Sequence, residues 1–222
     1  MSQSFPERLK NYLNERYKNE RYFEPYEIET NPNLLPSTIE GKHTKWSVET
    51  EWPESCSCIK EDVDGKVWIV SYPLCWIDDW LSEILWKIYG PRIKGAEGEE
   101  KRRLFARMHE KEDEIFNDLL NRKNWDKYLK KRLYRDLVID LMWSDEVAKR
   151  ISEKFGIEII LVISHMNYKT YLNSSFDSKG LNEEQKFEEI KKRVEAILAA
   201  RKLYGDSKER KKFWKELLAK AK

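Results

Sequence analysis

Hydrophobic residues change their spacing twice along this chain, and this change limits the possible folds more than any other feature. Lys66–Tyr72 is rich in branched and aromatic residues and follows an Asp64-Gly65 turn, which is typical of the second strand of a hairpin. From Trp76 to Tyr89 the apolar residues recur at helical spacing instead. A second strand pattern begins at Ile157, and helical spacing returns after Asn182. Strands in two blocks among helices predict an α+β fold.

We expect a small mixed β-sheet packed with about seven helices, in a single domain over residues 1–222 with a helical insertion at about 96–150. Capping patterns predict where several helices begin, at Ser4, Asn182 and Asp206. Gly90-Pro91 predicts the end of the helix that begins at Trp76, and Gly156 the end of another. The remaining expected strands are Lys45–Glu51, Ser55–Glu61, Ile157–Ser164 and Tyr168–Leu172, and the remaining expected helices are Glu99–Leu120, Asn124–Trp143 and a short helix capped by Ser144.

Composition excludes several classes of protein. The chain of 222 residues has nine Trp, eleven Tyr and eight Phe, enough aromatic surface to bury a core, so wholesale disorder is excluded. No apolar run approaches the ~18 residues of a membrane span, and we expect no membrane partner. The amino terminus lacks the pattern of a secretion signal, and three cysteines are too few for a disulfide framework, so we expect a cytoplasmic protein. From the cysteines we predict no metal centre.

Charge is unevenly distributed although the formal net charge is only +2. The segment Arg122–Arg135 has seven basic residues and a single acid, and Lys191–Lys222 has twelve basic residues and four acids. Such local excess, rather than the total charge, decides whether a polyanion is attracted. The scarcity of glutamine beside abundant lysine and glutamate is also the bias of proteins from very hot environments, and predicts a thermophilic source.

The region from Cys58 to Tyr89 resembles the RecB-like exonucleases of the PD-(D/E)XK nuclease superfamily. The strand pair Ile59–Pro73, its turn and the helix that follows have the hydropathy of that family's core, and Phe155–Lys202 resembles its later strand pair and closing helix. The resemblance implies a nuclease-like fold. The family's two acids and lysine would fall on Ile59, Ser71 and Pro73, which bind no Mg²⁺, so the site is expected to be degenerate or relocated.

Two basic helices provide the main functional prediction. On a helical wheel, one side of the predicted helix 124–143 and its approach gathers cations and the other side gathers apolar residues. The terminal helix has a second set of cations, with Trp214 near them for stacking. We therefore predict a nucleic-acid-binding protein, with DNA or RNA as partner, that uses Lys123, Lys127, Lys130, Lys131, Arg135, Lys208, Arg210, Lys211, Lys212 and Lys215.

Two other functions stay open at this point. The first is a non-enzymatic interaction or assembly factor, because five tryptophans cluster in one third of the chain, at Trp46, Trp52, Trp76, Trp80 and Trp86. The second is a metal-dependent nuclease with a relocated acidic site at Asp62 and Asp64, which would need Mg²⁺. The alternative role for these two acids is turn formation, which favours Asp for backbone reasons. The sequence leaves open whether the protein is an enzyme.

Overall fold

The core of the molecule is a six-stranded mixed sheet with the strand order β1-β3-β4-β6-β5-β2. The computed structural model describes residues 4–18, 28–29, 44–47, 57–71, 77–164 and 169–220. The four central strands, β3, β4, β6 and β5, are antiparallel to one another, and the outer strands β1 and β2 pair in parallel with β3 and β5. The strands are β1 (Ile28–Glu29), β2 (Thr44–Ser47), β3 (Ser57–Glu61), β4 (Lys66–Ser71), β5 (Ile160–Ser164) and β6 (Lys169–Asp177).

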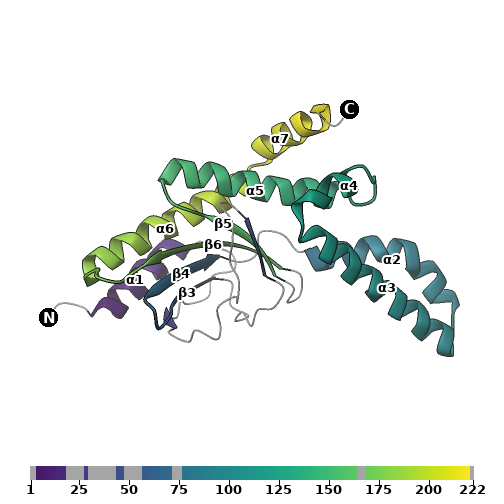
Figure 1. Cartoon of the computed structure of the whole chain (residues 1–222), viewed down its shortest axis with the longest axis horizontal. Coiled ribbons are helices and arrows are strands. Elements are labelled where there is room, and N and C mark those ends of the chain that lie inside the picture. The colour runs from purple at the N-terminus through teal and green to yellow at the C-terminus, as the bar shows by residue number, and fades with distance from the viewer. Residues whose placement is uncertain are drawn as a thin grey trace.

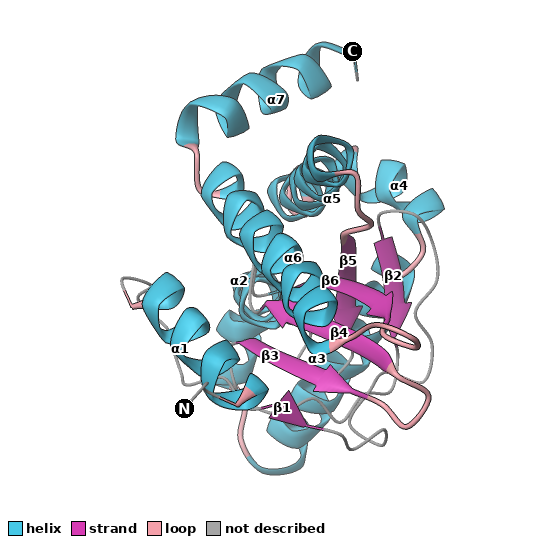
Figure 2. Cartoon of the chain, turned by 90° about the vertical axis from the view of Figure 1, so that its left-hand side faces the viewer, coloured by secondary structure: helices cyan, strands magenta, loops and turns pink. Residues whose placement is uncertain are grey.

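The described residues also contain seven α-helices, which confirms the predicted α+β class. They are α1 (Phe5–Tyr17), α2 (Ile77–Gly95), α3 (Gly98–Leu119), α4 (Trp125–Leu129), α5 (Arg135–Phe155), α6 (Glu183–Tyr204) and α7 (Ser207–Lys220). A short 3-10 helix, Arg122–Asn124, precedes α4. Helices α1, α5 and α6 cover one face of the sheet, whereas α2 and α3 project away from it as a helical hairpin (Figures 1 and 2).

Apolar side chains form two clusters that meet along α5. One cluster packs α1, α5 and α6 on the sheet, around the fully buried Trp143. The other packs α2, α3 and α4 on the first turns of α5, with buried residues such as Phe116 and Leu137. Helix α5 contributes to both clusters and therefore joins the projecting hairpin to the sheet. The helices within the predicted insertion, residues 96–150, thus build most of the second cluster together with α2.

Local sequence signals placed most elements correctly. The Ser4 backbone N–H donates to Glu7 Oε2 at 3.1 Å, and Asn182 and Gln185 exchange the two hydrogen bonds of a capping box. Gly65 has φ 82° in the β3–β4 turn and Gly156 has φ 63° after α5, as expected for a tight turn and a helix end. The sequence also predicts a tight turn at residues 165–167 and, from three prolines, an irregular connection at residues 24–41, but the turn and most of the connection lie outside the described residues.

The predicted helix end at Gly90-Pro91 is wrong, because α2 continues to Gly95. Proline lacks the N–H of one helical hydrogen bond, but packing compensates for that loss, since Ile93 and Ala96 beyond it are buried in the core cluster. Gly90 has a different role from ending the helix. A Cβ at this position would lie 2.9 Å from the Trp86 ring, so the glycine makes room for that ring.

The predicted helices around residues 124–155 are also wrong in their bounds. The chain turns at residues 130–134, and α5 then runs without interruption through Ser144 to Phe155. The turn lets Tyr128 and Tyr134 pack edge to face at 5.5 Å, whereas a straight helix would place them about 120° apart. Ser144 does not cap a new helix, because its Oγ donates to the Asp140 carbonyl within α5 at 2.9 Å.

Candidate nucleic-acid interface

Asp62 lies in the β3–β4 turn and uses its carboxylate to hold that turn. Its Oδ1 accepts hydrogen bonds from the Asp64 and Lys66 backbone N–H groups at 2.9 and 2.8 Å, and Oδ2 accepts from Trp68 Nε1 at 3.4 Å. Asp64 is exposed in the same turn. Within the part of the chain that the structure describes, no three His, Cys, Asp or Glu side chains are grouped to hold a metal ion. The hydrogen bonds of Asp62 match a role in turn formation, the alternative to a metal site for this acid.

We predict that the two acids of this turn differ in their effect on stability. Asp62→Ala is expected to lower the free energy of unfolding by about 1–2 kcal/mol, because two backbone donors lose their acceptor. Asp64→Ala is expected to change it by less than about 0.5 kcal/mol, as for other exposed positions. Urea unfolding followed by circular dichroism measures both. Equal losses in the two variants would show that the turn does not depend on the Asp62 carboxylate.

The positions that the nuclease resemblance would assign to catalysis contain no acid. Ile59 and Ser71 are buried in β3 and β4, at 1% and 2% exposure, and Pro73 lies outside the described residues. Lys60 and Asn173 are polar and also buried, but on the opposite sheet face from Ile59, since neighbouring side chains on a strand alternate. The described strands therefore have no carboxylate at the matching positions.

One basic part of the surface is the segment 122–135, which we call the α4 corner. Lys123, Lys130, Lys131 and Arg132 are exposed there, and Arg135 is half-buried at the start of α5. Among the described residues, no carboxylate lies within ion-pair distance of any of these five cations. The remaining two cations of the segment are neutralised, Arg122 by Asp145 and Lys127 by Asp118. The α4 corner thus has five cations without an acidic partner among the described residues, of which Arg135 also donates to the Leu129 carbonyl at 3.4 Å.

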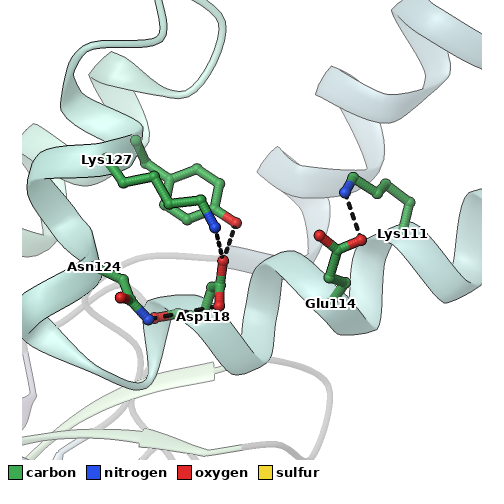
Figure 3. A network of polar contacts seen from close by, with 6 residues as sticks. Lys111, Glu114, Asp118, Asn124 and Lys127 are labelled. Carbon is green, nitrogen blue, oxygen red and sulfur yellow. Dashed lines mark hydrogen bonds and ion pairs between the residues drawn. The ribbon is translucent and has the colours of Figure 1, made fainter.

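Asp118 at the end of α3 holds the α4 corner in place (Figure 3). Its carboxylate pairs with Lys127 and accepts a hydrogen bond from the Tyr128 hydroxyl at 2.6 Å, while its backbone carbonyl accepts from Asn124 Nδ2 at 3.1 Å. The Lys127 ammonium and then the Tyr128 hydroxyl lower the pKa of Asp118 below its usual value. Lys127, one of the predicted nucleic-acid contacts, therefore serves first as a structural partner of this carboxylate.

The terminal helix α7 supplies the second basic surface. Lys208, Lys211, Lys212 and Lys215 are all exposed, and in the described chain no ion pair involves any of them. Arg210 differs, because it pairs with the Asp140 carboxylate of α5, which is only 2% exposed. The Tyr204 hydroxyl donates to the same carboxylate at 2.6 Å. Arg210 thus anchors α7 and is not available as a surface cation.

Trp214 is not placed for stacking on a base. Its ring packs against the α2–α5 core cluster, its Nε1 is buried, and the Arg210 guanidinium lies 5.5 Å from the ring centroid. The expectation of a stacking platform on α7 is therefore wrong for this residue. What α7 presents to solvent is a row of lysines.

Both basic surfaces are attached to the same helix. The α4 corner leads into α5, and α7 contacts α5 through the Asp140–Arg210 and Glu209–Arg150 pairs. Figure 1 shows α7 running above α5 toward the end where α4 lies, and Figure 2 shows α4 and α7 on adjacent sides of α5. Of the ten predicted contacts, the structure leaves eight cations without an acidic partner among the described residues and uses Lys127 and Arg210 for structure.

Arg132 is a basic residue that the helical wheel missed. On a continuous helix it falls outside the cationic side, but the turn at 130–134 exposes it beside Lys130 and Lys131. The signal that could have found it is the consecutive run Lys130-Lys131-Arg132, since three adjacent cations favour an exposed turn over a packed helix face.

No family model, no curated protein and no solved structure matches this chain. Within the described residues, none of the helices combines the length and apolar character needed to cross a bilayer.

Proposed function

We propose that this protein binds nucleic acid through contacts of the α4 corner and α7 with the phosphate backbone. The observation that carries the proposal is the exposed run Lys130-Lys131-Arg132, whose cations have no acidic partner among the described residues. The four exposed lysines of α7 extend the positive surface on the same helical support. Cations of this kind attract a polyanion and release its counterions on binding.

The side chains of the α4 corner and α7 favour contacts to phosphate rather than to bases. Tyr128, the aromatic ring nearest these cations, is buried, with Lys127 and Lys131 at 5.0 and 4.9 Å from its centroid. Trp214 is packed against the core. Lysine and arginine without exposed aromatic partners position a protein on the backbone but read no sequence. The proposed binding is therefore independent of sequence.

We predict that binding to a labelled DNA duplex weakens steeply with salt and depends on the α4 corner. The variant Lys130→Ala/Lys131→Ala/Arg132→Ala is expected to lower affinity at low salt by about tenfold or more. It should also reduce the slope of log K against log salt by roughly 2–3, since each lost phosphate contact removes about 0.9. Fluorescence anisotropy of the duplex, measured across a salt series, gives both quantities.

The matched control is Lys10→Ala/Lys179→Ala/Lys192→Ala, which removes the same charge from exposed positions outside the α4 corner and α7. It is expected to retain nearly the affinity and slope of the parent protein. Equal losses in the two triple variants would mean that total charge, not this surface, drives binding. An absence of binding at low salt would remove the proposal altogether.

A second function, protein–protein interaction, is favoured by a different observation. Of the five clustered tryptophans, Trp86 is 39% exposed on the projecting α2–α3 hairpin, and Ile88 on the same helix is 46% exposed. Trp80 is packed against the core, and the side chains of Trp46, Trp52 and Trp76 lie outside the described residues. We propose this interaction as an additional function that can accompany nucleic-acid binding.

A further inference from the structure

The α2–α3 hairpin projects from the body of the molecule (Figure 1) and has an uneven charge distribution. We call residues 77–86 and 108–119 its root, and residues 87–107 its tip. The root has eight acids and one base, and the tip has seven bases and three acids. Its net charge is therefore −7 at the root and +4 at the tip. Because α2 and α3 are antiparallel, each helix places its acids beside the acids of the other and its bases beside the other's bases.

This charge order does not stabilise the hairpin by itself. Among the described residues, the ion pairs Arg102–Glu99 and Lys111–Glu114 lie within α3 rather than between α2 and α3. In α3 the arrangement also opposes the helix dipole, because the second half is acidic and the last turn contains no base. At the root, Lys127 of α4 neutralises Asp118, and Ser82 of α2 donates to buried Glu112 of α3 at 2.6 Å. The exposed acids of the root and the exposed bases of the tip still have like charges as neighbours, which is unfavourable, and a partner with the opposite order would relieve it.

One stripe of α2 shows the charge order most clearly. Asp79, Glu83, Lys87 and Lys94 are all exposed and follow one another at spacings of four, four and seven residues, so they share one side of the helix. The stripe spans about 22 Å. Its midpoint falls at Trp86 and Lys87.

An apolar side chain, Trp86, lies at the midpoint of this stripe, and packing holds it in position. The Trp86 ring is 39% exposed, rests on Gly90 and contacts Phe105 of α3 at 6.3 Å between centroids. A large aromatic side chain held in one position at the centre of a charged surface is typical of an interface anchor.

We propose that a second copy of this chain binds along the α2 stripe in antiparallel orientation. A two-fold axis between Trp86 and Lys87 would place Asp79 of one copy opposite Lys94 of the other, and Glu83 between Lys87 and Lys94 of the other, twice. An interface between identical copies must be complementary to itself, and a stripe that is acidic on one side of its centre and basic on the other satisfies this condition. The projection of the hairpin leaves space for the second copy.

The test is the mass of the protein in solution, measured by sedimentation equilibrium at micromolar concentration. A dimer is expected at low salt, and it should weaken at about 1 M salt, where charges are screened beyond roughly 3 Å. A monomer at every concentration tested would overturn the proposal, as would a complex only with a different protein.

Exchanging the charges of the stripe distinguishes this interface from any other dimer interface. The tip variant Lys87→Glu/Lys94→Glu and the root variant Asp79→Lys/Glu83→Lys each give a stripe of one sign, so each is expected to be monomeric when alone. An equimolar mixture of the two should restore the dimer, because the two stripes are then complementary. Failure of the mixture to associate, or dimers in either variant alone, would overturn the antiparallel arrangement.

Trp86→Ala tests the centre of the interface, with Val63→Ala as control. Both residues are exposed and apolar, but Val63 lies in the β3–β4 turn, away from the hairpin. Trp86→Ala is expected to weaken dimerisation at least tenfold, and Val63→Ala to leave it unchanged. Circular dichroism confirms that the helices remain. Equal dimerisation of Trp86→Ala and the parent protein would contradict a centre at Trp86.

Discussion

Trp143→Ala is expected to lower the free energy of unfolding by about 3–5 kcal/mol, because the alanine leaves a large cavity in the cluster that packs α1, α5 and α6 on the sheet. Trp143 is fully buried in α5, and its ring contacts Phe213 of α7 at 5.3 Å between centroids. Its Nε1 donates to the Tyr204 carbonyl at the end of α6 at 3.1 Å, and that hydrogen bond is also lost. Urea unfolding followed by tryptophan fluorescence and circular dichroism measures the change.

The Trp143→Ala substitution should also weaken the packing of α7, since Trp143 contacts both α6 and α7. Limited proteolysis is therefore expected to cleave the variant between α6 and α7, near Gly205, earlier than the parent protein. Val63→Ala is the control, because Val63 is 81% exposed and its loss should cost less than about 0.5 kcal/mol. A loss below about 1 kcal/mol for Trp143→Ala would contradict the central packing role given to this residue.

Arg210→Met is expected to lower the free energy of unfolding by about 2–3 kcal/mol at neutral pH. It leaves the Asp140 carboxylate, 2% exposed, buried without its cation. The expected loss is below the ~3–5 kcal/mol of a fully buried pair, because the Arg210 side chain is 34% exposed. The double variant Asp140→Asn/Arg210→Met should recover most of this loss, since it removes the uncompensated charge. Urea unfolding of the three proteins provides the comparison.

The effect of Arg210→Met should depend on pH with a defined sign. Burial raises the pKa of Asp140 above its usual value, while the Tyr204 hydroxyl and Arg210 partly oppose that rise. Without Arg210 the pKa rises further, so the folded state favours the protonated acid more strongly. The destabilisation is therefore full at neutral pH and declines as the pH falls toward the ordinary Asp value of about 3.9. A loss that grows in acid would contradict an ionised Asp140 as its cause.

Short-range patterns were sufficient for the elements that depend on neighbouring residues. The Ser4 and Asn182 caps, the Asp64-Gly65 turn and the Gly156 helix end involve groups within a few residues of each other. Their hydrogen bonds and backbone angles are decided locally, so residue type predicts them. The same holds for the α+β class, which follows from the change of hydrophobic spacing.

Long-range packing decided the elements that the sequence patterns placed wrongly. Burial of Ile93 keeps α2 helical beyond Pro91, and the contact between Tyr128 and Tyr134 accompanies a turn where the pattern indicated one straight helix. Burial of Ile93 and Ala96 together is comparable with the ~3 kcal/mol that a proline costs inside a helix, whereas the helix preferences of ordinary residues are worth less than ~1 kcal/mol each.

The candidate nucleic-acid surface likewise depends partly on the sequence alone and partly on the tertiary structure. The sequence by itself determined that cations are concentrated in residues 122–135 and in the terminal helix, because charge is a property of each side chain. Only the tertiary structure decided which of them remain available, since Asp118 and Asp140 come from other elements and neutralise Lys127 and Arg210. Such pairs join residues 9 to 70 positions apart, and folding alone brings them within ion-pair distance.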